Sequence, residues 1–288
     1  MEAGQRVALA GMIVSGMLAT VKITTGLMGH STAVVADGLE SASDVFASGF
    51  VMLGLTLAAK PADENHPYGH GRAEILTGLL IGLLLASGGL LISYHSLGII
   101  GTAHPPIAAY VIWPLILSLL CKTALSATKF RYGRRLRSAA LVADAWNDAM
   151  DTLSAVVALI AVGLSLSDPA RFLDADRYGG FAVGLIVIYC GVRVIRDTVM
   201  QLMDTMPNDA RMSEVRQAAA SVPGVAGVEK CFARKTGMRY HVDLHLEVDP
   251  EMSVRQSHDI AHEVRLQVLN RLDWVADVLV HVEPAPRS

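Results

Sequence analysis

Charged residues are scarce in this chain of 288 residues: they make up 18% of it, whereas hydrophobic residues make up 52%. This balance is rare in soluble globular domains and is typical of membrane proteins. The formal net charge of −3 is too small to argue for binding to nucleic acid, so we expect no such partner. Only three cysteines occur, Cys121, Cys190 and Cys231, and their wide spacing argues against a disulfide framework and against a thiolate metal site.

Long apolar runs fill most of the chain up to residue 200. A helix needs roughly 20 apolar residues to cross a bilayer. Runs of this length lie at about 7–28, 34–57, 75–100, 107–128, 139–165 and 179–200. The first run is longer than the hydrophobic core of a signal peptide, so we interpret it as a retained span. The sequence therefore predicts six membrane-spanning helices in a domain of residues 1–206.

Basic residues in the short loops predict the orientation of the spans. The loop after the second span carries Lys60 and Arg72. The loop after the fourth span carries Lys129, Arg131, Arg134, Arg135 and Arg137. The other loops have no basic residue, or have two that are offset by aspartates. Basic loops stay in the cytoplasm, so we expect both termini to be cytoplasmic. The short loops and the lack of an organelle-targeting segment favour the bacterial cytoplasmic (inner) membrane.

The composition becomes mixed after Pro207, where a small soluble domain is predicted. Apolar residues have helical spacing at 209–221 and 253–270, and they indicate strands at 225–235, 239–248 and 277–283. The order αββαβ predicts a two-layer α+β domain over residues 207–288. A core of this size is marginal, so we expect the domain to be stabilised by association of two chains.

Acidic residues inside two apolar runs are the most specific feature. The stretch 35–44 (VADGLESASD) returns as 142–151 (VADAWNDAMD). Residues four apart share a helix face, and the pairs with this spacing are Glu40 with Asp44 and Asn147 with Asp151. An acidic residue at the bilayer centre costs roughly 2.5–3.5 kcal/mol. Helix bridging by hydrogen bonds is one explanation, but the repetition favours a binding site between two repeats.

Three carboxylates and one amide oxygen suit a divalent cation, because oxygen ligands favour ions such as Mn²⁺, Fe²⁺ or Mg²⁺. When the ion leaves, we expect protons to take its place on the carboxylates. The neighbouring Asp37, Asp144 and Asp148 are interpreted as structural, or as part of the ion path. Lys22 and Lys122, in the first and fourth spans, are expected to extend toward the membrane surface.

Two further groups of metal-binding residue types lie outside the spans. Asp63, His66 and His70 follow the second span at spacings that could close on one ion, although Asp, Asn, Pro and Gly in this loop are equally typical of solvated turns. The C-terminal domain contains His245, His258, His262, His281 and Glu283. Surface histidines are common, but imidazoles and a carboxylate together make a metal site plausible there.

These stretches together resemble the cation diffusion facilitator family over nearly the whole chain. The likeness is carried by the repeated approach to Asp44 and Asp151, by residues 65–74 (NHPYGHGRAE), and by the segments VDLHL and VHVEP at 242–246 and 280–284. The resemblance implies a homodimeric, proton-coupled exporter of divalent metal, not an enzyme. It also implies six membrane helices and a cytoplasmic ferredoxin-like domain of the metallochaperone type.

The resemblance also assigns residues. It places the transport site on Glu40, Asp44, Asn147 and Asp151, a loop site on Asp63, His66 and His70, regulatory sites on His245, His258, His262, His281 and Glu283, and a charge interlock at the dimer interface on Arg72 and Asp204. Zinc transporters of the family usually have His or Asp where this chain has Glu40 and Asn147. Oxygen ligands alone favour Mn²⁺ or Fe²⁺, whereas the histidine-rich C-terminal domain still suits Zn²⁺, so all three ions stay open.

Two other functions compete with transport. Asn147 cannot ionise, a feature that fits a membrane-anchored metal sensor or assembly partner that no longer transports. Paired aspartates in a membrane also suggest an aspartyl hydrolase, but the two further histidine groups argue against that function.

Overall fold

The computed structural model describes residues 2–102, 105–135, 139–169, 171–172 and 174–286; the side chains of 2–11, 48, 51, 55, 133, 135 and 139–144 lie outside this description. Arg137, and the side chains of Arg135 and Asp144, therefore lie outside the described part. The chain forms two compact units, Met1–Met52 with Leu80–Ile195, and Leu53–Leu79 with Arg196–Ser288. The second unit contains one end each of three membrane helices together with the C-terminal domain.

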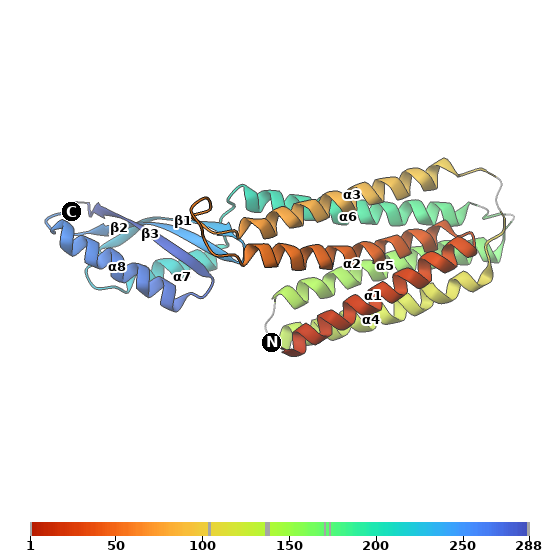
Figure 1. Cartoon of the computed structure of the whole chain (residues 1–288), viewed down its shortest axis with the longest axis horizontal. Helices are drawn as coiled ribbons and strands as arrows, with labels where there is room; N and C mark the ends of the chain where they lie inside the picture. Colours follow the sequence, from red (N-terminus) through yellow and green to blue (C-terminus); the bar gives the residue numbers. More distant parts are fainter. Residues whose placement is uncertain (1, 103–104, 136–138, 170, 173, 287–288) are drawn as a thin grey trace. The chain divides into compact units, whose positions relative to one another are not determined.

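Long helices make up the chain as far as residue 202 (Figure 1). They are α1 (Glu2–Met28), α2 (Thr32–Ala58), α3 (Arg72–Gly98), α4 (Ile112–Arg135), α5 (Ala139–Ser167) and α6 (Ala175–Leu202), with a short 3-10 helix η1 (Ala109–Val111) before α4. Five helices are long and apolar enough to cross a membrane, and in α1 the apolar part with described side chains is Met12–Met28. The six predicted helices are confirmed, although α4 continues well beyond the predicted end at residue 128.

Small residues bring α3 and α6 close together. A Cβ atom added at Gly89 would lie 2.8 Å from the carbonyl oxygen of Gly184, and one added at Gly191 would lie 2.5 Å from the backbone nitrogen of Ala86. Helix backbones can approach this closely only where the contacting residues lack side chains. The glycines on these two faces therefore serve helix packing.

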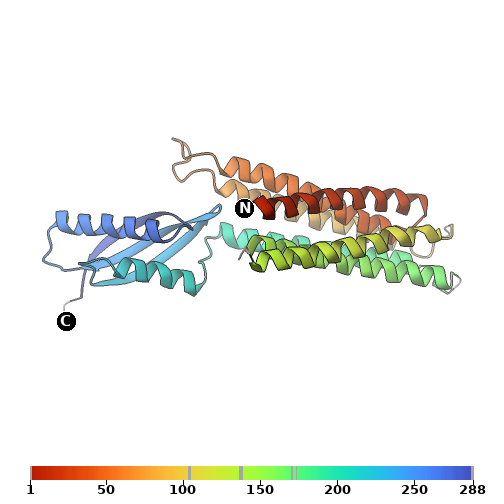
Figure 2. The same ribbon diagram turned by 90° about the horizontal axis from the view of Figure 1, so that it is seen from below.

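The start of α2 is fixed by a carboxylate from another helix. Asp176 of α6 accepts hydrogen bonds from the Ser31 hydroxyl and from the backbone N–H of Thr32, both at 2.5 Å. Free N–H groups at a helix start are stabilised by such acceptors. On the other side of the bundle α4 packs along α5, and α1 packs against α4 (Figure 2). These contacts hold α2, α4 and α5 in fixed positions inside the bundle.

The C-terminal domain has the predicted αββαβ order. It consists of α7 (Asp209–Ala220), β1 (Gly227–Thr236), β2 (Arg239–Val248), α8 (Val254–Arg271) and β3 (Val275–Pro284). The sheet order is β1-β2-β3, with β1 antiparallel and β3 parallel to β2. Both helices cover one face of the sheet, as Figure 1 shows. The fold class expected from the sequence is confirmed.

Strand β2 determines which side chains remain available for chemistry. Val242, Leu244, Leu246 and Val248 are buried in the core against α7 and α8. Successive side chains of a strand point to opposite faces, so the intervening residues, His241, Asp243, His245 and Glu247, point to the face that these helices leave open. The alternation in sequence thus places histidine and acidic side chains on one surface of the sheet.

Candidate metal sites

Acidic side chains from two helices meet inside the membrane bundle. Glu40 on α2 and Asp151 on α5 are each 6% exposed, and Asp44, one turn after Glu40, is half-buried. Ser154 donates a hydrogen bond of 2.9 Å to Glu40 Oε1, but Glu40 Oε2 is buried with no hydrogen-bond partner among the described residues. Glu40 also lies within electrostatic range of Asp44 and Asp151. An unpaired acidic oxygen in such a position is a natural ligand for a cation.

A lysine lies between these carboxylates. Lys122 on α4 is 1% exposed, and its ammonium group donates to Asp151 and, at 3.3 Å, to Asp44. Asp148 lies 3.9 Å from the same ammonium group. The expectation that Lys122 extends to the membrane surface is wrong, because α4 packs along α5 and turns this side chain into the bundle.

The other polar residues in the bundle include four that form ion pairs and one, Asn147, that is exposed. Lys22 is buried and bound to Asp37 at 2.8 Å, so it too does not reach the surface. Asp148 pairs with Lys129 at 2.7 Å. The role of Asp37 and Asp148, structural or as part of the ion path, stays a prediction. Asn147 is exposed, so the structure does not bury it together with Asp151. Its participation as a ligand stays a prediction.

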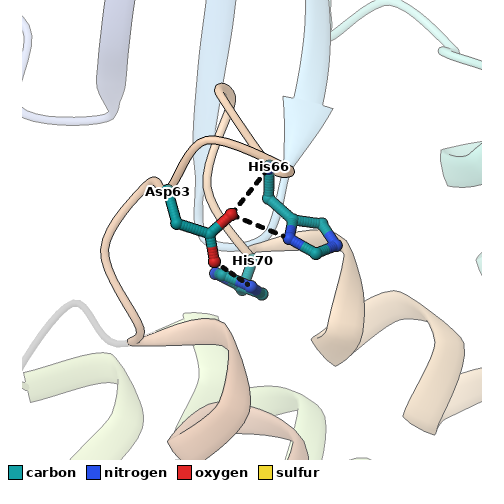
Figure 3. Close-up of side chains that lie close together, drawn as sticks. All are labelled: Asp63, His66 and His70. Atoms are coloured by element: carbon teal, nitrogen blue, oxygen red, sulfur yellow. Dashed lines mark hydrogen bonds and ion pairs between the residues drawn. The ribbon is translucent and has the colours of Figure 1, made fainter.

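Asp63, His66 and His70 come together in the loop between α2 and α3, as Figure 3 shows, with possible ligand atoms within 4.8 Å of one another. Asp63 Oδ1 lies 3.0 Å from His66 Nδ1 and accepts the backbone N–H of His66 at 2.7 Å, while Oδ2 lies 3.4 Å from His70 Nε2. The hydrogen bond from the His66 side chain holds the pKa of Asp63 below its usual range. The local spacing predicted from sequence is thus present.

The loop that carries this group is anchored on the C-terminal sheet. The ring of Tyr68 meets that of His241 edge to face at 5.7 Å, and the guanidinium of Arg234 lies 5.3 Å from the Tyr68 ring centre. A Cβ atom at Gly71 would lie 2.7 Å from the carbonyl oxygen of Thr236, so the two backbones nearly touch. These contacts hold the loop against the β1–β2 turn and order the side chains of the group.

Three residues form a second group on the open face of the C-terminal sheet. They are His245, His281 and Glu283, again with possible ligand atoms within 4.8 Å of one another. His245 Nδ1 lies 2.5 Å from Glu283 Oε1, and His281 Nε2 lies 3.6 Å from the same oxygen. Because β2 and β3 pair in parallel with His245 opposite His281, the register itself creates this group. Two imidazoles and a carboxylate fit a borderline divalent ion such as Zn²⁺.

His258 and His262 do not join this group within one chain. Both are exposed on α8, which packs on the opposite face of the sheet from His245. The group of five expected from the sequence is therefore only partly formed among the described residues of a single chain. The cause is the strand alternation that buries Leu244 beneath the helices and turns His245 away from them.

The two residues expected to form a charge interlock lie in contact. Arg72 at the start of α3 donates to Asp204 Oδ1 at 3.1 Å, and the two side chains are 51% and 46% exposed. Exposed pairs of this kind contribute little to stability, typically about 0–1 kcal/mol. Their place at an interface between two chains stays a prediction.

Sequence reasoning missed two residues that shape the intramembrane site. Ser154 orients Glu40, and Lys122 binds Asp44 and Asp151. The signal for Lys122 was a lone basic residue within an apolar run, which also fits a side chain that reaches the surface. The signal for Ser154 was its position one turn after Asp151, on the same helix face. Burial of Cys231 raises the pKa of its thiol to about 11, which agrees with an inert filler.

A bundle of apolar helices with buried carboxylates, joined to a domain with a histidine–carboxylate group, defines a membrane transporter of metal cations rather than an enzyme. The chain belongs to the cation efflux family. Residues 8–203 match the family model of the cation efflux transmembrane domain, and residues 207–285 match that of the cytoplasmic domain of cation efflux proteins. The protein is therefore an integral membrane protein, and the resemblance to the cation diffusion facilitator family is confirmed.

Named relatives share about three residues in ten with this chain. A manganese efflux system protein, MneP of Bacillus subtilis, is 28% identical, and the alignment includes 98% of this chain and 97% of MneP. The magnetosome protein MamB of a Magnetospira strain is 31% identical, and the alignment includes 92% of this chain and 90% of MamB. Metal tolerance protein C1 of Arabidopsis thaliana is 30% identical; the alignment includes 99% of this chain but only 63% of that protein.

Proposed function

We propose that the protein exports a divalent metal cation, Mn²⁺, Fe²⁺ or Zn²⁺, from the cytoplasm in exchange for protons. The observation that supports this proposal is the buried Oε2 atom of Glu40, which has no hydrogen-bond partner among the described residues and lies within electrostatic range of Asp44 and Asp151. A carboxylate oxygen without a partner inside a membrane bundle is costly unless a cation or a proton binds it. If the site opens alternately to the two sides of the membrane, exchange of a metal ion for protons at this site transports the metal.

In this proposal Glu40, Asp44 and Asp151 bind the metal, and Asn147 adds an amide oxygen when α5 brings it inward. Protons replace the metal on the carboxylates after release, so the unloaded site is not left with uncompensated charge. The oxygen ligands favour Mn²⁺ or Fe²⁺, and the name of the Bacillus relative, a manganese efflux protein, agrees with the first of these. The histidine-containing groups outside the membrane keep Zn²⁺ open as a substrate or regulator.

The other two groups are proposed as regulatory metal sites in a homodimer. Asp63, His66 and His70 hold metal near the cytoplasmic ends of α2 and α3, while His245, His281 and Glu283 hold it on the open sheet face, with His258 and His262 available to a second chain. Metal at these regulatory sites affects transport only if its binding changes the affinity of the intramembrane site for metal. The basic loops favour an orientation with both termini in the cytoplasm, and the short loops favour the bacterial inner membrane as the location.

The test is proton flux in proteoliposomes under gradients of Mn²⁺, Fe²⁺, Zn²⁺ or Cd²⁺. We expect the wild type to move protons with at least one ion, Asp151→Asn to abolish that flux, and Asn147→His to move the preference toward Zn²⁺. The exposed Asp168, at the end of α5, provides a matched control, and Asp168→Asn should transport normally. Metal binding without proton movement in the wild type would make the protein a sensor and overturn the proposal.

A further inference from the structure

The ammonium group of Lys122 lies where the proposed transport site has its carboxylates. It contacts Asp151 on α5 and lies 3.3 Å from Asp44 on α2, while the lysine itself is on α4. The Lys122 side chain is only 1% exposed. Three helices therefore meet at one positive charge.

A buried lysine is costly, and its retention needs partners that offset the loss of hydration. Asp44 and Asp151 provide that compensation, but they are also two of the three carboxylates proposed to bind the metal. The ammonium group binds one oxygen of each of these two carboxylates. A metal ion that binds the same two carboxylates therefore competes with a positive charge that belongs to the chain.

We infer that Lys122 is a tethered competing cation, which the transported metal must displace from Asp44 and Asp151. This inference rests on the proposed function. With Lys122 present, the three carboxylates and the ammonium group carry a net charge of −2, which matches the charge of a divalent ion. The lysine therefore favours a divalent ion over a monovalent one and keeps the metal from binding so tightly that it is not released.

A second acceptor for the displaced ammonium group lies nearby. Asp148, three residues before Asp151 on α5, is 3.9 Å from Lys122 and is 4% exposed. Its carboxylate also binds Lys129 at 2.7 Å. A shift of the Lys122 side chain toward Asp148 frees the oxygens of Asp44 and Asp151 while the ammonium group keeps an acidic partner.

The experiment measures Mn²⁺ binding to the full-length protein in nanodiscs by calorimetry. All variants carry His66→Ala and His281→Ala, so that the loop and C-terminal groups do not contribute. We expect Lys122→Met to tighten binding about tenfold or more, because a competing unit charge at contact distance is removed. In proteoliposomes the same variant should show a lower KM together with a lower kcat, because metal is bound more tightly and released more slowly. Lys122→Arg keeps the charge and should restore the Kd toward the wild-type value.

Two further variants separate the possible failures. The double variant Lys22→Met with Asp37→Leu, measured on the monodisperse fraction, removes a buried pair of opposite charges and should leave Mn²⁺ affinity near that of the wild type. Equal tightening in this double variant and in Lys122→Met would mean a general effect of altering buried charges and would overturn the inference, as would an unchanged Kd in Lys122→Met. If Asp151→Asn also binds Mn²⁺ normally, the proposed transport site itself is wrong.

A further measurement uses only the wild type, so it does not require that variants lacking a buried lysine fold correctly. Structures of the protein with and without Mn²⁺, determined in nanodiscs, should differ in the position of Lys122. We expect its ammonium group to leave Asp44 and Asp151 when metal is bound and to approach Asp148. Retention of both contacts in the metal-bound structure would contradict displacement.

Discussion

Lys22 and Asp37 form an ion pair of 2.8 Å in which the two side chains are only 1% and 2% exposed. Ser41 and Ser118 accept further hydrogen bonds from the Lys22 ammonium group, at 2.7 and 3.2 Å. The pair thus links α1, α2 and α4 around a fully bonded charge. In this respect it differs from Glu40, one oxygen of which has no hydrogen-bond partner in the part of the chain that the structure describes. The contrast separates structural charges in the bundle from those available to a ligand.

Breaking this pair on one side should destabilise the bundle. Asp37→Asn leaves the buried ammonium group without a counter-charge, a change that typically costs about 3–5 kcal/mol. We expect a clear fall in the melting temperature of the detergent-solubilised protein. The double variant Lys22→Met with Asp37→Leu removes both charges and should recover much of the loss. A single variant that melts with the wild type would show that water reaches the pair.

Ser154 should matter for metal affinity through the orientation of Glu40. Ser154 is 0% exposed, and its hydroxyl donates to Glu40 Oε1 at 2.9 Å, which restricts the orientation of the carboxylate. Hydrogen bonds to charged groups contribute roughly 1.5–3 kcal/mol, so we expect Ser154→Ala to raise the KM for Mn²⁺ by about ten- to a hundredfold. The measurement is metal-dependent proton flux over a range of Mn²⁺ concentrations.

Another serine on α5 provides the control for this prediction. Ser165 donates to the carbonyl oxygen of Phe172 and accepts from the backbone N–H of Asp176, and it is remote from Glu40 in the chain. Ser165→Ala should therefore leave the KM unchanged. If both variants shift the KM equally, the effect comes from loosening of α5 and not from Glu40.

The loop group should show an acid-dependent contribution from Asp63. The hydrogen bond from His66 lowers the pKa of this carboxyl group in the folded protein. A lowered pKa means a stabilising contribution that is present above the unfolded value of about 3.9 and is lost as the pH falls through the folded value. The difference in melting temperature between wild type and Asp63→Asn should be constant from neutral pH to about 5, and it should shrink only below about 4.

His66→Ala provides the matched control, because it removes the side chain whose hydrogen bond lowers this pKa. In the His66→Ala protein, the change in melting temperature caused by Asp63→Asn should be smaller at neutral pH than it is in the wild type. A difference that already declines well above about pH 5 would mean that a group other than Asp63 controls it, and would refute the role given to Asp63.

The helices and the C-terminal fold followed from the sequence because each depends on local periodicity. Apolar runs located six helices, and the alternation in residues 239–248 located β2. The repeated acidic stretch also located Glu40, Asp44 and Asp151, since an intramembrane carboxylate is expensive unless it is used. The loop group was predictable as well, because Asp63, His66 and His70 are close in sequence.

Contacts that depend on how elements pack were not predictable in this way. Lys122 lies close to the end of the predicted fourth span, a position typical of a side chain that reaches the surface. The helix α4 instead continues to Arg135 and packs along α5, so Lys122 lies deep in the bundle. Likewise, the spacing of His258 and His262 shows that they share a helix face, but only the tertiary fold shows that α8 covers the sheet face opposite His245.

Arg72 and Asp204 allow a test of the proposed dimer that uses charge reversal. Their ion pair of 3.1 Å is about half exposed and should contribute no more than about 1 kcal/mol to the stability of one chain. If it also braces two chains, Arg72→Asp or Asp204→Arg alone should increase the monomer fraction seen by mass photometry, with little change in melting temperature. The double reversal should restore the dimer, because opposite charges face each other again. Dimers that survive both single reversals would place the interface elsewhere.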